Sequence, residues 1–320
     1  MIYDAIAAGD LNVITDRVDI SRKYLKGELL DKDRPSKVKH EIPKKVYDDW
    51  DALAIPSTSD LKAFVSSISK AWAIQFTFTL ATPYMSKSIE AFDLLDNPII
   101  RDKVYEVPII PASSWKGGLR SAATIIAMEE RKVSLQDVAK DKRIIRLFGN
   151  EREQNDNFSA GRLHCFPTGF KNTTCEVINP HDRARRVGTI PILLECVPVD
   201  QDGTFTILYV PFGDSNIQES FDDLDLCAKA ITSLLTVWGI GAKKSNGNGL
   251  AKDSLKDLHI EPREKKSLET GSQKPKKQQS LKSLSALSTF SQQQNFQEII
   301  TFEQFQIQVK KSAQLFQGGK

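Results

Sequence analysis

The run from Trp72 to Leu80 is the feature that most constrains the fold of this chain. Its large apolar residues alternate with mostly polar ones, and they are Ile74, Phe76, Phe78 and Leu80. A period of two places successive side chains on opposite faces, so the run predicts a half-buried β-strand. Regular structure is predicted to begin here, because the residues before it are polar and mixed in charge.

A second pattern predicts a strand, a tight turn and a helix in succession. Val107 to Ile110 is a short apolar run that Pro111 stops. From Trp115 to Glu130 the apolar residues follow helical spacing. Ser113 or Ser114 is predicted to cap the start of this helix, because a hydroxyl oxygen can accept a hydrogen bond from a free N–H of the first turn.

Further strands are predicted in the second half of the chain. Arg162 to Phe166 is one, with His164 as a packed histidine between apolar neighbours. Pro191 to Pro198 and Gly203 to Val210 also alternate, and turn residues separate them. Two alternating runs around such a turn predict an antiparallel hairpin.

A helix is predicted to follow, with an apolar face that ends at Trp238. Its first turn is predicted to hold carboxylates that the helix dipole favours, namely Asp222, Asp223 and Asp225. Gly239 to Gly249 is predicted to be a flexible basic loop before a last strand near residues 250–260. The order strand, helix, hairpin, helix predicts an α+β fold of the ferredoxin-like or RNA-recognition-motif-like kind.

Composition predicts one sizeable core with a polar segment on each side. The chain has 320 residues, which is long enough for one large domain or two small ones, and 40% of the residues are apolar, which is enough for a core. We expect residues 1–70 to form an N-terminal polar extension and residues 71–261 to form the core. Residues 262–320 are expected to form a basic low-complexity linker and a terminal helix.

Membrane insertion and secretion are not expected. No run approaches the roughly 20 apolar residues that span a bilayer. Residues 1–4 lack the charged start and apolar run of a secretory signal, so a cytoplasmic protein without a membrane partner is predicted. The 4 cysteines contain no Cys-x-x-Cys pair, which favours reduced thiols over a zinc site.

Two predicted segments carry groups that attract polyanions. Ser113, Ser114 and Lys116 lie at a helix start, where free N–H groups and the dipole favour phosphate, and Arg120 follows one turn later. The alternative is a plain cap with an exposed lysine. The glycine-rich loop adds polar and basic side chains that could contact RNA phosphates at close range. These are Lys243, Lys244, Ser245 and Asn246. Its alternative is a merely flexible connection.

A basic cluster near the middle of the chain is a further candidate for RNA binding. It consists of His181, Arg183, Arg185 and Arg186. These residues could line an RNA path, and His181 could protonate a leaving 5′-oxygen. The alternative is a solvated basic face.

Three motifs resemble those of a known family. The run Ile109-Ile110-Pro111-Ala112-Ser113-Ser114-Trp115-Lys116-Gly117-Gly118-Leu119-Arg120 resembles the Ile-Pro-Gly-Ser-Ser-Leu-Lys-Gly-x-Leu-Arg motif of the RAMP superfamily of CRISPR effector subunits. Gly239 to Gly249 is similar to the glycine-rich loop of that superfamily. Asp96-Asn97-Pro98-Ile99-Ile100-Arg101-Asp102 is similar to a stretch of the backbone subunits of type III effector complexes. The departures are Ala112, where the motif has glycine, and the two terminal segments.

The resemblance implies a backbone-type subunit that binds crRNA and stacks with other effector subunits. It implies cleavage of the paired target RNA at a flipped nucleotide, by attack of the ribose 2′-hydroxyl. Asp96 matches the carboxylate that the family needs for this metal-dependent step, which implies Mg²⁺ or Mn²⁺ as cofactor and Asp96 as a metal ligand or base. The alternative for Asp96 is an Asx-turn before Pro98. Arg101 is predicted to support the site by holding a phosphate. Asp93 and Asp102 are weaker candidates for a second metal contact, and the alternative for both is that they only keep the loop soluble.

Two other functions remain open from the sequence. One is a non-catalytic structural or capping subunit of the same complex. The other is a stand-alone RNA-binding protein without crRNA. Sequence-specific reading of RNA is not expected, because the aromatic pairs of a base-stacking sheet are absent from the predicted strands.

Overall fold

The structure is a computed structural model, and it describes residues 53, 55–88, 97–150, 158–178, 181–182, 187–188, 192–213, 216–262 and 299–317. Its centre is a four-stranded sheet in the order β11-β1-β10-β4, with every pairing antiparallel. These strands are β1 (Trp72–Leu80), β4 (Leu163–Cys165), β10 (Asp202–Tyr209) and β11 (Ala251–Pro262).

Helix α5 (Ala112–Arg131) lies in the chain between β1 and β4, and α8 (Ile217–Ser233) lies between β10 and β11. The core strands therefore stand in the spatial order fourth, first, third, second. This is the arrangement of a ferredoxin-like domain, so the predicted α+β fold is confirmed.

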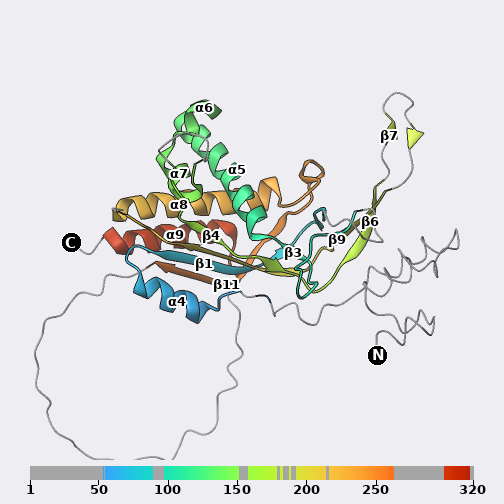
Figure 1. Cartoon of the computed structure of the whole chain (residues 1–320), viewed down its shortest axis with the longest axis horizontal. Helices are drawn as coiled ribbons and strands as arrows, with labels where there is room; N and C mark the ends of the chain where they lie inside the picture. The colour runs from blue at the N-terminus through green and yellow to red at the C-terminus, as the bar shows by residue number, and fades with distance from the viewer. Residues whose placement is uncertain are drawn as a thin grey trace, which may run out of the picture.

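Helices cover both faces of the sheet (Figure 1). Helices α5, α8 and α9 (Phe302–Gln317) lie on one face, and α4 (Thr58–Ser67) lies on the other. The short helices α6 (Leu135–Val138) and α7 (Lys142–Phe148) follow α5 in the chain.

The prediction of a half-buried β1 was wrong, since its residues are buried on both sides except for a partly exposed Thr77. Regular structure also begins before Trp72, because Leu61 and Val65 of α4 pack under the sheet against Ala73. The polar residue Gln75 is satisfied in this buried place, because its Nε2 donates to the Pro56 carbonyl oxygen and to Thr206 Oγ1, both at 2.9 Å.

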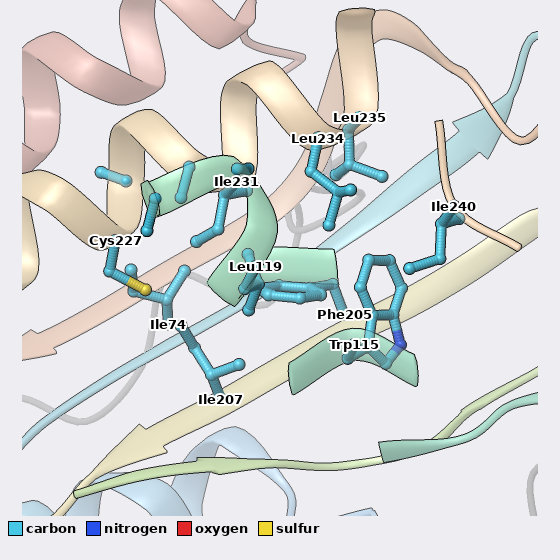
Figure 2. Close-up of a cluster of buried hydrophobic side chains, with 14 of the residues drawn as sticks. Ile74, Trp115, Leu119, Phe205, Ile207, Cys227, Ile231, Leu234, Leu235 and Ile240 are labelled. Carbon is cyan, nitrogen blue, oxygen red and sulfur yellow. The ribbon is translucent and has the colours of Figure 1, made fainter. Parts of the chain in front are cut away.

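The main core fills the space between the four-stranded sheet and the helices α5, α8 and α9 (Figure 2). Trp115 and Leu119 of α5 face Phe205 of β10, and Leu234 and Ile240 approach from the other side. Burial of each such side chain contributes about 1.5–3 kcal/mol. Trp115 fixes the start of α5 on the sheet, because its Nε1 also donates to Thr168 Oγ1 at 3.0 Å.

Smaller sheets extend the domain at one end. β2 (Tyr84–Met85), β9 (Ile192–Val197) and β6 (Thr174–Ile178) form a three-stranded sheet. β3 (Ile109–Ile110) pairs with β5 (Thr168–Gly169), and β7 (His181–Asp182) pairs with β8 (Val187–Gly188).

The predicted hairpin between β9 and β10 was wrong, although both strands exist. β9 pairs with β2 and β6, whereas β10 pairs with β1 and β4. The turn between them carries the chain from one sheet to the other. It is fixed on the end of β1, where Leu80 N donates to the Gln201 oxygen and Asp200 N donates to the Leu80 oxygen, both at 2.9 Å.

The helix α8 also differs from its prediction. It begins at Ile217 with Asn216 as its cap, so Asp223 lies inside the helix and not in its first turn. Asp223 is buried and pairs with Arg146, whose Nη2 lies 2.7 Å from Asp223 Oδ1. A π-helix (Leu234–Trp238) continues α8, and Trp238 is 44% exposed instead of closing the apolar face.

The helix predicted near the C-terminal end is confirmed as α9. Phe302, Phe305 and Val309 are buried in the main core. Just before the helix, Ile300 bridges to Leu255 of β11. Among the described residues, no helix combines the length and apolar character required to cross a bilayer.

Candidate nucleic-acid interface

A surface pocket of about 310 Å³ lies where three separate segments meet. One is β2 with the residues after it, the second is the first two turns of α5, and the third is the glycine-rich loop after α8. The lining residues are Tyr84, Ser86, Lys87, Ser114, Gly118, Gly239, Ile240, Gly241, Ala242 and Lys244. The fold therefore brings together the helix start and the glycine-rich loop, which the sequence pointed to independently.

The start of α5 offers uncapped N–H groups beside this pocket. The first backbone bond of the helix runs from Trp115 N to the Pro111 oxygen at 3.1 Å. The predicted cap at Ser113 or Ser114 was wrong, because Pro111 is the cap residue and makes no side-chain hydrogen bond. The N–H groups of Ala112, Ser113 and Ser114 therefore have no partner inside the helix. Such groups and the helix dipole favour a bound anion.

The two glycines of α5 have different surroundings. A Cβ atom on Gly118 would lie 3.1 Å from Ile240 Cδ1 and 3.1 Å from Leu234 Cδ2. Gly118 thus allows α5 to pack closely against the base of the glycine-rich loop. A Cβ atom on Gly117 would meet nothing within 4 Å among the described residues. Packing inside the chain does not account for a glycine at this exposed position, whereas close approach by a ligand does.

The glycine-rich loop is held in place, so the prediction of a flexible loop was wrong. Ala242 N donates to the Met85 oxygen at 2.7 Å, and Ile240 N donates to the Gly249 oxygen at 3.0 Å. Gly241 has φ +97°, and a Cβ atom there would lie 2.2 Å from the Met85 oxygen. The buried side chain of Ile240 anchors the loop in the core (Figure 2). A short 3₁₀ turn, Lys244–Asn246, forms the tip of the loop.

The rim of the pocket is positively charged. Lys87, Lys243 and Lys244 are exposed, and none of them pairs with a described carboxylate. Ser245 and Asn246 are exposed at the same tip. Cations that lack acidic partners are available to a polyanion, which gains affinity by releasing counterions.

Lys116 and Arg120 lie on a different side of α5 from the pocket. Residues two apart on a helix differ by about 200°, so Lys116 faces away from Ser114 and Gly118. Its charge acts on β4 instead: burial first, and Lys116 second, lower the pKa of His164 below its ordinary value. His164 is exposed, so its prediction as a packed histidine was wrong. The predicted cationic cluster is thus divided between two sides of the helix.

The acidic loop, which is the segment of residues 89–96 that contains Asp93 and Asp96, follows pocket residues in the chain. Asp93 and Asp96 lie outside the described residues. The described residues on each side of this loop are joined, because Ser88 N donates to the Pro98 oxygen at 2.9 Å. Ser86 and Lys87, just before the loop, contribute to the pocket or its rim. The segment that contains Asp96 therefore leaves and re-enters the described fold close to the candidate interface.

Arg101 and Asp102 have local partners within the fold. Arg101 forms a two-pronged ion pair with Glu195, whose side chain is completely buried. Glu195 also accepts a hydrogen bond from Ile99 N at 3.0 Å. Asp102 Oδ1 accepts from Val104 N at 2.9 Å and from Tyr105 N, which forms the following turn. These contacts give Arg101 and Asp102 each a structural role in the fold. Their support of catalysis stays a prediction.

One residue of the basic cluster, His181, is described by the structure. His181 belongs to β7 and pairs with Gly188 of β8, and Figure 1 places β7 well away from α5. Arg183, Arg185 and Arg186 lie outside the described residues. His181, the described residue of the cluster, therefore lies apart from the pocket, and the roles predicted for the three arginines stay predictions.

The described residues include no group of three or more His, Cys, Asp or Glu side chains placed to hold a metal ion. All cysteines are free thiols, and Cys196 and Cys227 are buried. Burial raises the pKa of Cys196 to about 12, so this thiol stays protonated at neutral pH.

Sequence reasoning missed several pocket residues. Tyr84 and Ser86 line the pocket although no motif contains them. Lys87 carried a weak signal, since it immediately precedes the acidic loop. The others join the site only through the pairing of β2 with β9 and the hydrogen bond from Ala242 to Met85, which are long-range contacts.

Comparison with known proteins identifies the family of this chain. The family model described as the RAMP superfamily matches residues 52–252, which include the start of α5 and the glycine-rich loop. A curated relative, the CRISPR system Cms endoribonuclease Csm3 of Streptococcus thermophilus, is 35% identical over 79 residues. That alignment covers 24% of this chain and 34% of the relative, so the chain matches only about a third of the relative's length.

A solved structure is similar in fold. It is the cryo-EM structure of the Type III-B Cmr-beta bound to cognate target RNA. The match has a TM-score of 0.50 and 18% identity, and it covers 77% of each chain. At this level of identity the match establishes a shared fold.

Proposed function

This chain belongs to the RAMP superfamily, and from that premise we propose that it is a backbone subunit of a cytoplasmic type III CRISPR ribonucleoprotein. In this proposal the pocket between α5 and the glycine-rich loop binds the sugar-phosphate backbone of crRNA, and other effector subunits are its protein partners. The observation that carries the proposal is that the pocket brings the uncapped start of α5 next to Lys87 and Lys244, which pair with no described carboxylate. The type III relatives support it.

The pocket suits a backbone better than a base. Backbone N–H groups and lysines hold phosphate oxygens without reading sequence. The glycines allow an RNA chain to come close to the protein backbone. Sequence recognition is then left to base pairing between the guide and the target RNA.

We further propose that the subunit cleaves the paired target RNA. The ribose 2′-hydroxyl attacks the adjacent phosphorus, a new 2′-oxygen–phosphorus bond forms, and the bond to the 5′-oxygen breaks. Asp96 accepts the 2′-hydroxyl proton or holds a metal ion, and the leaving 5′-oxygen takes up a proton. Mg²⁺ or Mn²⁺, held by Asp96 and RNA oxygens, would stabilise charge on the phosphate when bound.

The test compares Asp96→Ala with Asp93→Ala in the complex reconstituted with crRNA and its sibling subunits. We expect Asp96→Ala to slow target cleavage by about 100-fold or more, the usual contribution of a general base, while assembly and bound crRNA stay normal. Asp93→Ala, in the same loop, serves as the matched comparison, and its effect on cutting is expected to be much smaller because Asp93 is the weaker candidate.

Two outcomes would change the assignment. Unchanged cutting by Asp96→Ala would indicate a structural or capping subunit of the same complex. Purification without a bound RNA of defined length, from cells that express the whole complex, would indicate a protein that does not use crRNA.

A further inference from the structure

Trp238 is an exposed aromatic residue directly next to the pocket in the chain. It is 44% exposed, and its neighbour Val237 is 67% exposed. The next residues, Gly239 and Ile240, line the pocket. Consecutive Cα atoms lie about 3.8 Å apart, so the backbone of Trp238 is directly beside a residue that lines the pocket.

The backbone holds Trp238 in this exposed position. Gly239 N donates to the Leu234 oxygen at 2.8 Å, which closes a π-helical turn. Leu234 and Leu235 of that turn are buried in the core (Figure 2). Because the wide turn keeps both leucines inside, the last residues, Val237 and Trp238, are turned outward. Single π-turns of this kind occur frequently at functional sites.

No described aromatic side chain packs against the indole ring of Trp238. In the core, by contrast, Trp72 stacks on Tyr209, and Trp115 makes edge-to-face contacts with Phe78 and Phe205. After Gly239 and Gly241, the same loop carries two exposed lysines, Lys243 and Lys244. An exposed aromatic ring beside a basic groove is the arrangement that binds single-stranded nucleic acid, with the phosphates on the cations and a base on the ring.

We propose that Trp238 stacks on one base of the RNA strand held at the pocket. This inference rests on the proposed function, because it needs the strand to follow the basic rim. Every base has a π face, so the contact fixes the position of the strand without selecting a sequence. Trp238 is thus a positioning residue that sets where the strand enters the pocket.

The experiment measures binding of a short single-stranded RNA to the full chain by fluorescence anisotropy. Trp238→Ala is expected to weaken binding by about 5- to 100-fold, and Trp238→Phe is expected to keep most of the affinity. Phe64→Ala is the matched control, since Phe64 is 43% exposed but lies on α4 at the opposite face of the sheet. It is expected to leave binding unchanged.

A second arm replaces single nucleotides of the same RNA by abasic ribose, one position at a time. In the wild-type protein one position should weaken binding, and the same position should have no further effect in Trp238→Ala. If the abasic position weakens RNA binding by the same factor in the wild-type protein and in Trp238→Ala, the proposal is overturned. Circular dichroism checks that each variant is folded.

The outcomes separate the two claims. If RNA binds and substitution of Lys243 and Lys244 weakens it, but Trp238→Ala has no effect, stacking is wrong and the proposed function stands. If Trp238→Ala binds RNA normally but fails to assemble with sibling subunits, the ring is a protein contact and stacking is also overturned. Absence of RNA binding by the wild-type chain would overturn both claims.

Discussion

The adjacent glycines of α5 allow a sharp test of how the site is built. Gly117→Ala and Gly118→Ala make the same chemical change one residue apart in the same helix. Each replaces a helix-interior glycine by alanine, which stabilises a helix by about 0.5–1 kcal/mol. The two variants differ in what the new methyl group meets.

At Gly117 the methyl group meets nothing within 4 Å among the described residues, so only the stabilisation of the helix by alanine remains. At Gly118 it would lie 3.1 Å from Leu234 and Ile240 side-chain carbons. Overpacking of this kind costs about 1–3 kcal/mol. Subtracting one variant from the other removes the shared helix gain, so the difference in unfolding free energy between them should be about 1–3 kcal/mol in favour of Gly117→Ala.

Urea denaturation measures the stabilities, and RNA titration measures function. Gly117→Ala should be more stable than the wild-type protein and yet bind RNA about tenfold more weakly, because one methyl group obstructs a close contact. Equal stabilities would refute the packing assigned to Gly118. Normal RNA binding by Gly117→Ala would refute the close approach of RNA to this turn.

Two further predictions concern buried charges. Glu195→Ala should lower the unfolding free energy by about 3–5 kcal/mol, because it leaves Arg101 without its buried partner, and the double change Arg101→Met with Glu195→Leu should recover much of that loss in urea denaturation. At Asp141, burial alone would raise the carboxyl pKa, but hydrogen bonds from Arg143 hold the pKa below its ordinary value of 3.8. The ionised group therefore stabilises the fold above that value, so Asp141→Asn should destabilise the protein at neutral pH and the difference should shrink between about pH 5 and pH 2. A difference that stays constant over this range would contradict the ion pair as its cause.

Local periodicity predicted the main elements of this fold well. The strand at Trp72, the helix from Trp115 and the last strand before Pro262 follow patterns that a short window contains. Their order was enough to predict the ferredoxin-like arrangement, because such an order leaves few compact topologies. The terminal helix α9 was predicted, but its packing into the core depends on contacts with α8 and β11 that no local window shows.

The errors arose where distant residues decide the structure. The turn at Asp200 is equally suited to a hairpin or to a crossing between sheets, and pairing with the end of β1 decides between them. The partner of Arg101 is 94 residues away in the chain. In the candidate site, sequence motifs identified the helix start and the glycine-rich loop, but the split between Ser114 and Lys116 required the actual direction of each side chain.

The central claim is that the lysines of the glycine-rich loop hold RNA phosphates. The direct measurement is the salt dependence of RNA affinity for the wild-type chain and for the double change Lys243→Gln with Lys244→Gln. For single-stranded RNA each phosphate contact contributes about 0.7 to the slope of log affinity against log salt. We therefore predict a slope smaller by roughly 1.4 in the double variant. Lys62→Gln, an exposed change on α4, should leave the slope unchanged. An unaltered slope in the double variant would contradict the account.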